Sequence, residues 1–252
     1  ESPKKIKVVL DCGNGSAGEI APKLIRALGY EVIELFCEID GNFPNHHPDP
    51  GKVENLQDLV QAVQENSADV GIAFDGDGDR LGVVTEKGEI IFPDQLMMIF
   101  TKDVLKNFPG KEIVFDVKCT NLLSNIIKES GGIPVMSPTG HFHIKNTLKQ
   151  TNAPLAGEMS GHIFFNDKWH GFDDGHYSAF RLLEIMHDLN IPLSSILGQL
   201  PKAFSTPELN INIEEEKKFE IVKNFVDKAQ FEGGSKVTID GLRVDFDDGW
   251  GL

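Results

Sequence analysis

The chain has 252 residues, of which 40% are hydrophobic and 25% are charged, a size and composition typical of a globular protein with one large or two small domains. Its formal net charge of −15 argues against nucleic acid and anionic membrane surfaces as partners, because both attract an excess of Lys and Arg. No apolar run approaches the roughly 20 residues that span a bilayer, and no basic-then-apolar signal peptide opens the chain.

The three cysteines indicate the redox compartment. Cys12, Cys37 and Cys119 are odd in number, lie far apart in the sequence and form no CxxC pair. A disulfide framework and a zinc site are therefore not expected. We predict that all three are small buried side chains in a protein of the reducing cytoplasm.

Strand and helix patterns alternate over the first 92 residues. A loop is expected at 40–51, where three prolines and two glycines interrupt any regular element. One helical face of 53–64 would carry Val53, Leu56, Leu59, Val60 and Val63. Strands are predicted at 6–10, 31–35, 70–74, 81–84 and 89–92, the last two as a hairpin, and helices at 21–28 and 53–64.

The alternation continues to residue 201 and then changes. Segment 204–213 alternates like a strand, 215–230 has a helical pattern, and two strands are expected around Asp240-Gly241. A strand-rich unit of about 50 residues lies at the low edge of independent stability. Between 93 and 201, helices are predicted at 95–105, 121–128, 142–149 and 174–187, and strands at 112–115, 133–136 and near Leu155 and Ile163.

Repeated βα units with buried strands predict an α/β protein with mixed, largely parallel sheets covered by helices. We expect a first α/β domain at 1–92, a second at 93–201 and an incomplete α+β C-terminal piece at 202–252.

Gly13, Gly15 and Gly18 form a GxGxxG pattern directly after a predicted strand. This pattern is typical of dinucleotide-binding sites. Gly-rich strand-to-helix turns also occur without a nucleotide, and Asn14 or Ser16 would cap the following helix in either case. The sequence favours a tight structural turn, and a nicotinamide-dependent oxidoreductase is the alternative.

The segment DGDGDR at 75–80 follows a buried strand. Three carboxylates at alternate positions, separated by flexible glycines, can surround one hard cation, and without a cation they would repel each other. We therefore predict a metal site formed by Asp75, Asp77 and Asp79. An EF-hand is rejected, because Arg80 stands where that loop requires Gly and the flanks have strand patterns.

Arg80 next to this predicted metal site suggests an anionic substrate, since a guanidinium can bind phosphate through two hydrogen bonds. An ion pair between Arg80 and the aspartate cluster is the structural alternative, and it is compatible with this role.

DGDGDR resembles the metal loop of the α-D-phosphohexomutases of the phosphomannomutase/phosphoglucomutase type. The sequence departs from that family at Gln95, Pro138 and Phe142, where Arg, Lys and Ser are common. The other motifs that carry the resemblance follow in the family's order: DCGNGSAG at 11–18, FPNHHPDP at 43–50, DVKCT at 116–120, TGH at 139–141, GEMSGH at 157–162, FDDG at 172–175 and DGLRVDFDDGW at 240–250.

The resemblance implies an intramolecular phosphotransferase that interconverts hexose 6-phosphate and hexose 1-phosphate, of mannose, glucose or both, through a 1,6-bisphosphate. A phosphoserine donates and recovers the phosphoryl group. One Mg²⁺ ion, held by Asp75, Asp77 and Asp79, neutralises charge at the transferring group.

GEMSGH resembles the sugar-recognition loop of the family, in which Glu158 and Ser160 would bind sugar hydroxyls. His162 is a candidate general acid or base, and Lys118 a candidate contact for the substrate phosphate. The residues implied as catalytic are Lys118, His162 and Arg80. Those implied as substrate-binding are Lys118, Thr139, Gly140, His141, Glu158, Met159, Ser160, Gly161 and His162.

No serine of this chain lies in a motif like the family's TASHNP phosphoserine loop. The resemblance also implies that the chain starts with the second of four domains and stops before the phosphate-binding loop of the fourth. We therefore expect a fragment with negligible mutase turnover and weak Mg²⁺ binding on its own. A natural non-catalytic sugar-phosphate-binding module is the remaining alternative.

Overall fold

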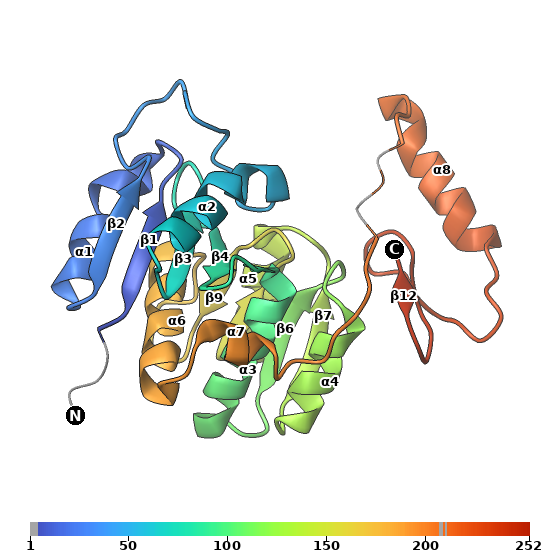
Figure 1. Ribbon diagram of the computed structural model, residues 1–252. Coiled ribbons are helices and arrows are strands. Elements are labelled where there is room, and N and C mark those ends of the chain that lie inside the picture. The colour runs from blue at the N-terminus through green and yellow to red at the C-terminus, as the bar shows by residue number, and fades with distance from the viewer. Residues whose placement is uncertain (1–4, 207–208, 210) are drawn as a thin grey trace.

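The computed structural model describes residues 5–206, 209 and 211–252. It shows two α/β units side by side and a smaller C-terminal unit (Figure 1). Among the described residues, no helix has the length and apolar character needed to cross a membrane.

The first unit is built on a five-stranded sheet with the order β2-β1-β3-β4-β5. β1 pairs in parallel with β2 and β3, whereas β3–β4 and β4–β5 are antiparallel. The strands are β1 (Lys7–Asp11), β2 (Glu31–Leu35), β3 (Val70–Phe74), β4 (Leu81–Thr85) and β5 (Ile90–Ile91), and the helices are the 3-10 turns η1 (Ser16–Glu19) and η2 (Val53–Leu56), α1 (Ala21–Ala27) and α2 (Gln57–Glu65).

Successive side chains of β1 point to opposite faces of this sheet, because side chains alternate along a strand. Val8 and Leu10 pack in the core that contains Ile25 of α1, whereas Val9 packs with Leu59 of α2. Both faces are therefore covered by helices, which explains why the strands are apolar runs.

The second unit has a four-stranded sheet with the order β7-β6-β8-β9. β6 pairs in parallel with β7 and β8, and β9 closes the sheet antiparallel to β8. The strands are β6 (Glu112–Asp116), β7 (Ile133–Ser137), β8 (Leu155–Gly157) and β9 (Ile163–Phe165), and the helices are α3 (Pro93–Asn107), α4 (Asn121–Glu129), α5 (His141–Thr151), α6 (Gly175–Leu189) and α7 (Leu193–Leu197).

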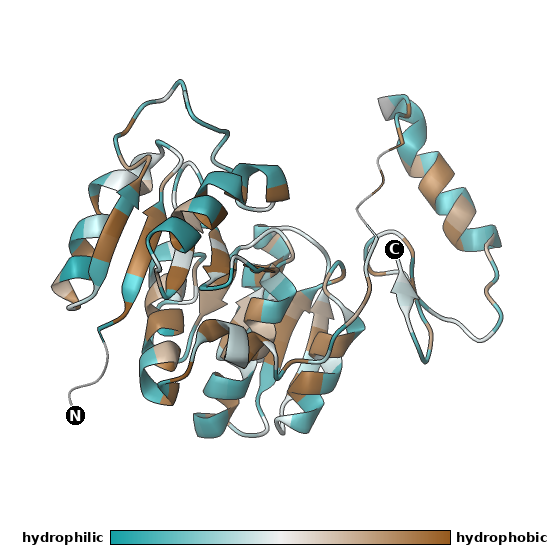
Figure 2. Ribbon diagram, in the orientation of Figure 1, coloured by the Kyte–Doolittle hydropathy of each residue, from teal (hydrophilic) through white to brown (hydrophobic). Residues whose placement is uncertain are grey.

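Helix α6 joins the two units. It contacts β3 and β4 of the first sheet and β9 of the second, and its buried Leu182 and Leu183 belong to a core that contains Val8 and Phe115. The hydropathy colours of Figure 2 show apolar residues on the strands and on the inner sides of these helices. The two sheets thus share one hydrophobic core.

The C-terminal unit consists of α8 (Glu215–Lys228) and an antiparallel sheet of β10 (Ser235–Val237), β11 (Arg243–Asp245) and β12 (Trp250–Gly251). α8 stands apart from the two α/β units in Figure 1 and exposes Phe219 and Phe225. This unit contacts the second unit through Arg243 of β11 and through Asp240 in the turn between β10 and β11.

Most predicted elements are present, and the mixed α/β architecture is confirmed. The strand predicted at 204–213 is wrong for its described residues, which form no ladder and leave Phe204 and Ile211 exposed; residues 207, 208 and 210 lie outside the described part. Segment 53–64 begins with a 3-10 turn, and Val53 is exposed instead of lying on the buried face. α7 and β12 were not predicted.

The predicted burial of the cysteines holds for Cys12 and Cys119, whereas Cys37 is only half-buried. Its Sγ lies 3.5 Å from Sγ of Cys12, because the ends of the neighbouring parallel strands β1 and β2 bring the two residues together. All three cysteines are free thiols.

Candidate active site

The loop 75–80 turns back on itself directly after β3. Oδ1 of Asp75 accepts hydrogen bonds from the backbone N–H groups of Gly78 and Arg80, each at 3.0 Å. Gly78 has φ +84°, a conformation that L side chains rarely adopt. The turn brings one carboxylate oxygen each from Asp75, Asp77 and Asp79 within 4.8 Å of one another.

The electrostatics of this loop suit a cation. Burial raises the pKa of Asp79 to about 6, and repulsion from Asp75 and Asp77 adds to this while His162 opposes it. Oδ1 of Asp79 is buried and has no hydrogen-bond partner among the described residues. An oxygen in that position is stabilised by a positive ion, so the three aspartates fit a hard divalent metal.

Arg80 is held inside the site. Its Nε donates to Oδ2 of Asp75 at 2.6 Å, and its Nη1 donates to Oδ1 of Asp49 at 3.0 Å. Burial opposes ionisation of Asp75, but the hydrogen bonds from Arg80 outweigh it and lower the pKa of Asp75. The structure thus shows the alternative considered for Arg80, an ion pair with the aspartate cluster.

The loop 157–162 connects β8 and β9 and faces the aspartate loop. Gly161, with φ +100°, accepts a backbone hydrogen bond from Leu81 at the end of the aspartate loop. Glu158 is 1% exposed, and its Oε1 accepts a 2.6 Å hydrogen bond from the N–H of Gly140. Its Oε2 has no hydrogen-bond partner among the described residues, so this oxygen is available to a hydroxyl donor.

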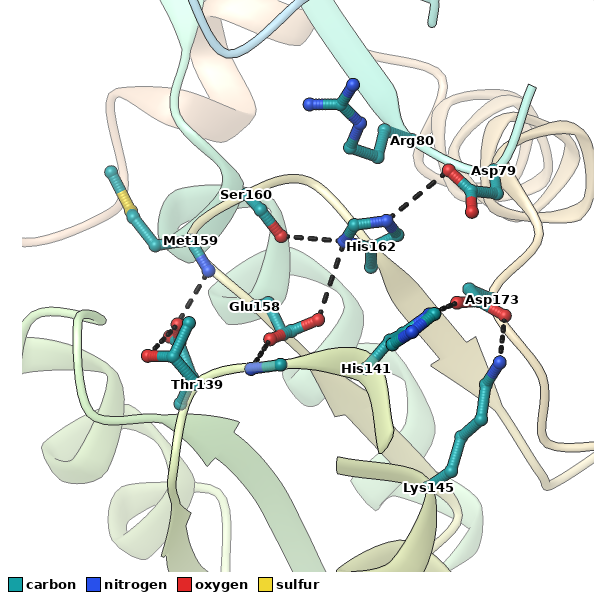
Figure 3. A network of polar contacts seen from close by, with 12 residues as sticks. Asp79, Arg80, Thr139, His141, Lys145, Glu158, Met159, Ser160, His162 and Asp173 are labelled. Atoms are coloured by element: carbon teal, nitrogen blue, oxygen red, sulfur yellow. Dashed lines mark hydrogen bonds and ion pairs between the residues drawn. The ribbon is translucent and has the colours of Figure 1, made fainter. Parts of the chain in front are cut away.

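His162 ends the loop 157–162, and its ring points toward Asp79 of the aspartate loop (Figure 3). Its Nε2 is 3.4 Å from Oδ1 of Asp79, and its Nδ1 is 2.7 Å from Oγ of Ser160 and 3.4 Å from Oε2 of Glu158. Burial lowers the pKa of His162, but the carboxylates of Glu158 and Asp79 outweigh this and raise it above the ordinary value. The imidazole therefore couples the aspartate loop to the predicted sugar loop.

His141 at the start of α5 lines the same region. Its Nδ1 is 3.3 Å from Oδ2 of Asp173, whose other oxygen accepts from Nζ of Lys145 at 2.7 Å. The His141 and His162 rings have centroids 6.0 Å apart. Figure 3 shows both imidazoles between the loops, with Asp173 beside them.

Asp116, at the carboxyl end of β6, organises the remaining predicted residues. Its buried carboxylate accepts hydrogen bonds from Oγ1 of Thr139, the N–H of Met159 and Sγ of Cys119. Lys118 is half-buried on the loop that follows. Loops after β6, β7 and β8 thus meet at one edge of the second sheet, where parallel strands end together.

Several residues of this site were not predicted as site residues. Asp116 ends a buried strand, which was a usable signal, and Asp173 lies in the FDDG motif. Asp49 lies in the FPNHHPDP motif, but its contact with Arg80 was not predictable because it spans 31 residues.

The GxGxxG turn supports the aspartate loop. The N–H and Oγ of Ser16 both donate to the carbonyl oxygen of Gly76, and a Cβ on Gly15 would lie 2.8 Å from that oxygen. The predicted capping by Asn14 or Ser16 is wrong: Asn14 donates to Glu38, and neither η1 nor α1 has a side-chain cap. The glycines allow two backbones to approach each other.

Comparison with known proteins decides the family. The profile described as phosphoglucomutase/phosphomannomutase, alpha/beta/alpha domain II, matches residues 1–88, and that of domain III matches residues 92–204. The chain belongs to the phosphoglucomutase/phosphomannomutase family. Neither the dinucleotide-binding oxidoreductase nor the non-catalytic module finds support in the comparisons.

Relatives of known name agree with this family. The chain is 57% identical over 249 residues to the phosphomannomutase/phosphoglucomutase of Pseudomonas putida and 54% identical over 251 residues to the phosphoglucomutase of Neisseria gonorrhoeae. A family protein from Burkholderia thailandensis of known structure is 52% identical, with a TM-score of 0.93 over 99% of this chain and 53% of its own. The chain spans about half the length of these relatives, 54% of the two curated sequences.

Proposed function

We propose that this site binds a hexose phosphate together with Mg²⁺. In the gene product that contains the chain, it would serve the interconversion of hexose 1-phosphate and hexose 6-phosphate of mannose, glucose or both. The single observation that carries the proposal is the contact of His162 with Asp79 on one side and with Ser160 and Glu158 on the other. The proposed cation site and the proposed hydroxyl-binding carboxylate of Glu158 would thus be parts of one site.

Asp75, Asp77 and Asp79 would hold the metal, since their oxygens converge. One of them, Oδ1 of Asp79, is buried and accepts no hydrogen bond among the described residues, although it lies 3.4 Å from Nε2 of His162. When bound, the ion supplies positive charge for the phosphoryl group. Arg80 fixes Asp75 in place through its 2.6 Å hydrogen bond.

Glu158 would select the sugar. Its Oε1 accepts a hydrogen bond from the N–H of Gly140, which fixes the carboxylate, and its Oε2 faces His162. A buried acceptor of this kind rejects a ligand that lacks the matching hydroxyl, because the acceptor is then left unsatisfied. Ser160 and the backbone of Met159 and Gly161 would complete the sugar contacts.

His162 would exchange a proton with the reacting sugar hydroxyl, with Ser160 orienting its Nδ1. Lys118 and Thr139 lie on loops at the same sheet edge, His141 lies at the start of α5, and all three would contact the phosphate or the sugar. Lys118 supplies a point charge for phosphate.

The phosphoryl donor implied for this chemistry is a phosphoserine outside residues 1–252. We therefore expect this polypeptide alone to bind hexose phosphate but to show negligible turnover. The three free cysteines support a cytoplasmic location as part of the same proposal.

A mutase assay on the gene product that contains this chain tests the proposal, with glucose 1-phosphate and mannose 1-phosphate as substrates. Asp77→Asn should lower kcat at least about a hundredfold, because it removes a charged ligand from the metal site. The matched control is Asp58→Asn, the same change at an exposed position of α2, which should leave the rate unchanged. Full activity in Asp77→Asn would refute the metal role, and inactivity toward both substrates would refute the proposed reaction.

A further inference from the structure

The C-terminal sheet contacts the two loops that carry the predicted phosphate and sugar contacts of the second unit. One is the loop 117–120 after β6, which holds Lys118. The other is the loop 138–140 after β7, which holds Thr139 and Gly140. Both contacts come from the segment 240–250, more than 100 residues away in sequence.

Arg243 makes the first contact. It is fully buried, and its Nη1 donates hydrogen bonds of 2.6 Å to the carbonyl oxygens of Val117 and Cys119. These carbonyls stand on either side of Lys118, so one nitrogen fixes the backbone from which the Lys118 side chain projects. The bridge spans 126 residues to Val117.

The Arg243 guanidinium also contacts two residues of its own sheet. Its Nε donates a 2.9 Å hydrogen bond to Oδ1 of Asp245, its Nη2 lies 2.8 Å from the same oxygen in an ion pair, and the ring centroid of Trp250 lies 4.1 Å from its Cζ. A buried cation is expensive unless each of its donors is satisfied. Nη2 has no hydrogen bond among the described residues, so the bonds of Nη1 to the loop 117–120 carry the contact. The sheet and this loop are held in one arrangement, because separating them would leave a second nitrogen of the buried cation without an acceptor.

Asp240 makes the second contact. Its Oδ2 accepts a 2.9 Å hydrogen bond from the N–H of Thr139. The neighbouring N–H of Gly140 donates to Oε1 of Glu158. The turn between β10 and β11, which holds Asp240, thus reaches the backbone that fixes the buried carboxylate.

We propose that Arg243 is a positioning residue: by holding the carbonyls of Val117 and Cys119 it fixes the loop that presents Lys118 to the substrate phosphate. Asp240 supports the adjacent loop in the same way. This inference rests on the proposed hexose phosphate site and adds the C-terminal sheet to it.

Two measurements on the 252-residue chain test the inference. In Arg243→Met, the backbone amides of 117–120 should exchange with solvent about tenfold faster, and glucose 1-phosphate should bind about tenfold more weakly in calorimetry. Arg243→Lys keeps the charge but loses the planar fork, so binding should fall between wild type and Arg243→Met. Lys223→Met, which removes an exposed charge from α8, is the matched control and should change neither quantity.

A double-mutant cycle separates positioning from a general structural role. If Arg243 acts through Lys118, then Arg243→Met should weaken binding in the wild-type background and have little further effect in Lys118→Ala. Additive effects of the two changes would overturn the inference, and so would unchanged exchange at 117–120. If Arg243→Met does not fold, as judged by circular dichroism, Arg243→Lys replaces it in the cycle with the same criteria.

Binding by Lys118→Ala distinguishes failure of the proposed phosphate contact from failure of the positioning role. If Lys118→Ala binds glucose 1-phosphate as tightly as wild type, the proposed role of Lys118 is wrong and the inference falls with it. If Lys118→Ala weakens binding and neither Arg243 variant does, only the positioning role is refuted.

Discussion

At the scale of single residues, the buried carboxylate of Asp11 is held by a partner distant in sequence. His46, in the loop before η2, binds the buried carboxylate of Asp11 at the end of β1, with 3.0 Å between Nε2 and Oδ2. This hydrogen bond, opposed by burial, raises the pKa of His46 to about 9. The pair ties the loop 40–51 to the first sheet.

The His46–Asp11 pair predicts a pH dependence of stability. Because the folded pKa exceeds the ordinary value of 6.5, its contribution is fully present below about pH 6.5 and is lost as the pH rises through about 9. The shift corresponds to at most about 3 kcal/mol. In urea unfolding series between pH 6 and 10, His46→Gln should remove this loss, whereas His187→Gln at an exposed site of α6 should retain it. An unchanged profile in His46→Gln would contradict the assignment.

Residue contacts were the part of the site least accessible from sequence. The DGDGDR pattern indicated convergent carboxylates because spacing and glycine content act within six residues. The sequence did not decide whether Arg80 binds a phosphate or pairs with the aspartates, since its partner Asp49 lies 31 positions away. Arg243 lies in the DGLRVDFDDGW motif, but its burial was not predictable because it depends on carbonyl groups of a loop over 120 residues earlier.

At the scale of elements, the aspartate loop is supported by the first turn of α6. The N–H of Gly175 donates to the carbonyl of Gly78, and His176 stacks on Phe74 with 4.7 Å between ring centroids. A Cβ on Gly175 would lie 2.7 Å from the carbonyl oxygen of Gly78 and 2.9 Å from that of Arg80. The loop therefore owes its shape to a helix that begins about 100 residues later.

Gly175→Ala should consequently distort the aspartate loop. The added methyl must displace backbone, which typically costs about 1–3 kcal/mol, and we expect a lower melting temperature together with weaker divalent metal binding. Calorimetry and metal titration measure both quantities. Gly41→Ala is the matched control, since its Cβ would meet nothing within 4 Å, and both variants behaving alike would refute this support.

Element prediction succeeded where burial and local pattern coincide. The run at 70–74 is buried at every position, and β3 forms there. The alternation at 204–213 gave the wrong result because a strand pattern forms a strand only where a partner strand exists, and the described residues of that segment have none. The domain boundaries near 92 and 201 remain predictions.

At the scale of the whole molecule, the two α/β units are joined by a continuous core. Phe74 of the first sheet and Phe115 of the second belong to the same buried cluster as Leu182 of α6. Periodicity could predict each layer, but not that α6 packs on both sheets, since one apolar helix face does not specify its partners.

The shared core predicts that residues 5–200 unfold in one cooperative transition. Leu182→Ala should destabilise both sheets together, by about 2–5 kcal/mol. Hydrogen exchange under mild denaturant measures this, with amides of β1 and β6 as reporters. Leu189→Ala, at a partly exposed position of the same helix, should have a smaller effect. Separate transitions for β1 and β6 would contradict the shared core.

We propose that the aspartate loop and the loop 157–162 form one site for a divalent ion and a hexose phosphate. Titration with Mn²⁺ in place of Mg²⁺, followed by NMR, tests it most directly, because a paramagnetic ion broadens the signals of nearby amides. We predict that Mn²⁺ broadens the amides of 75–80 and 158–162 together, that Mg²⁺ reverses the effect, and that glucose 1-phosphate shifts the signals of 158–162. Broadening centred elsewhere, with the amides of 75–80 unaffected, would contradict the account.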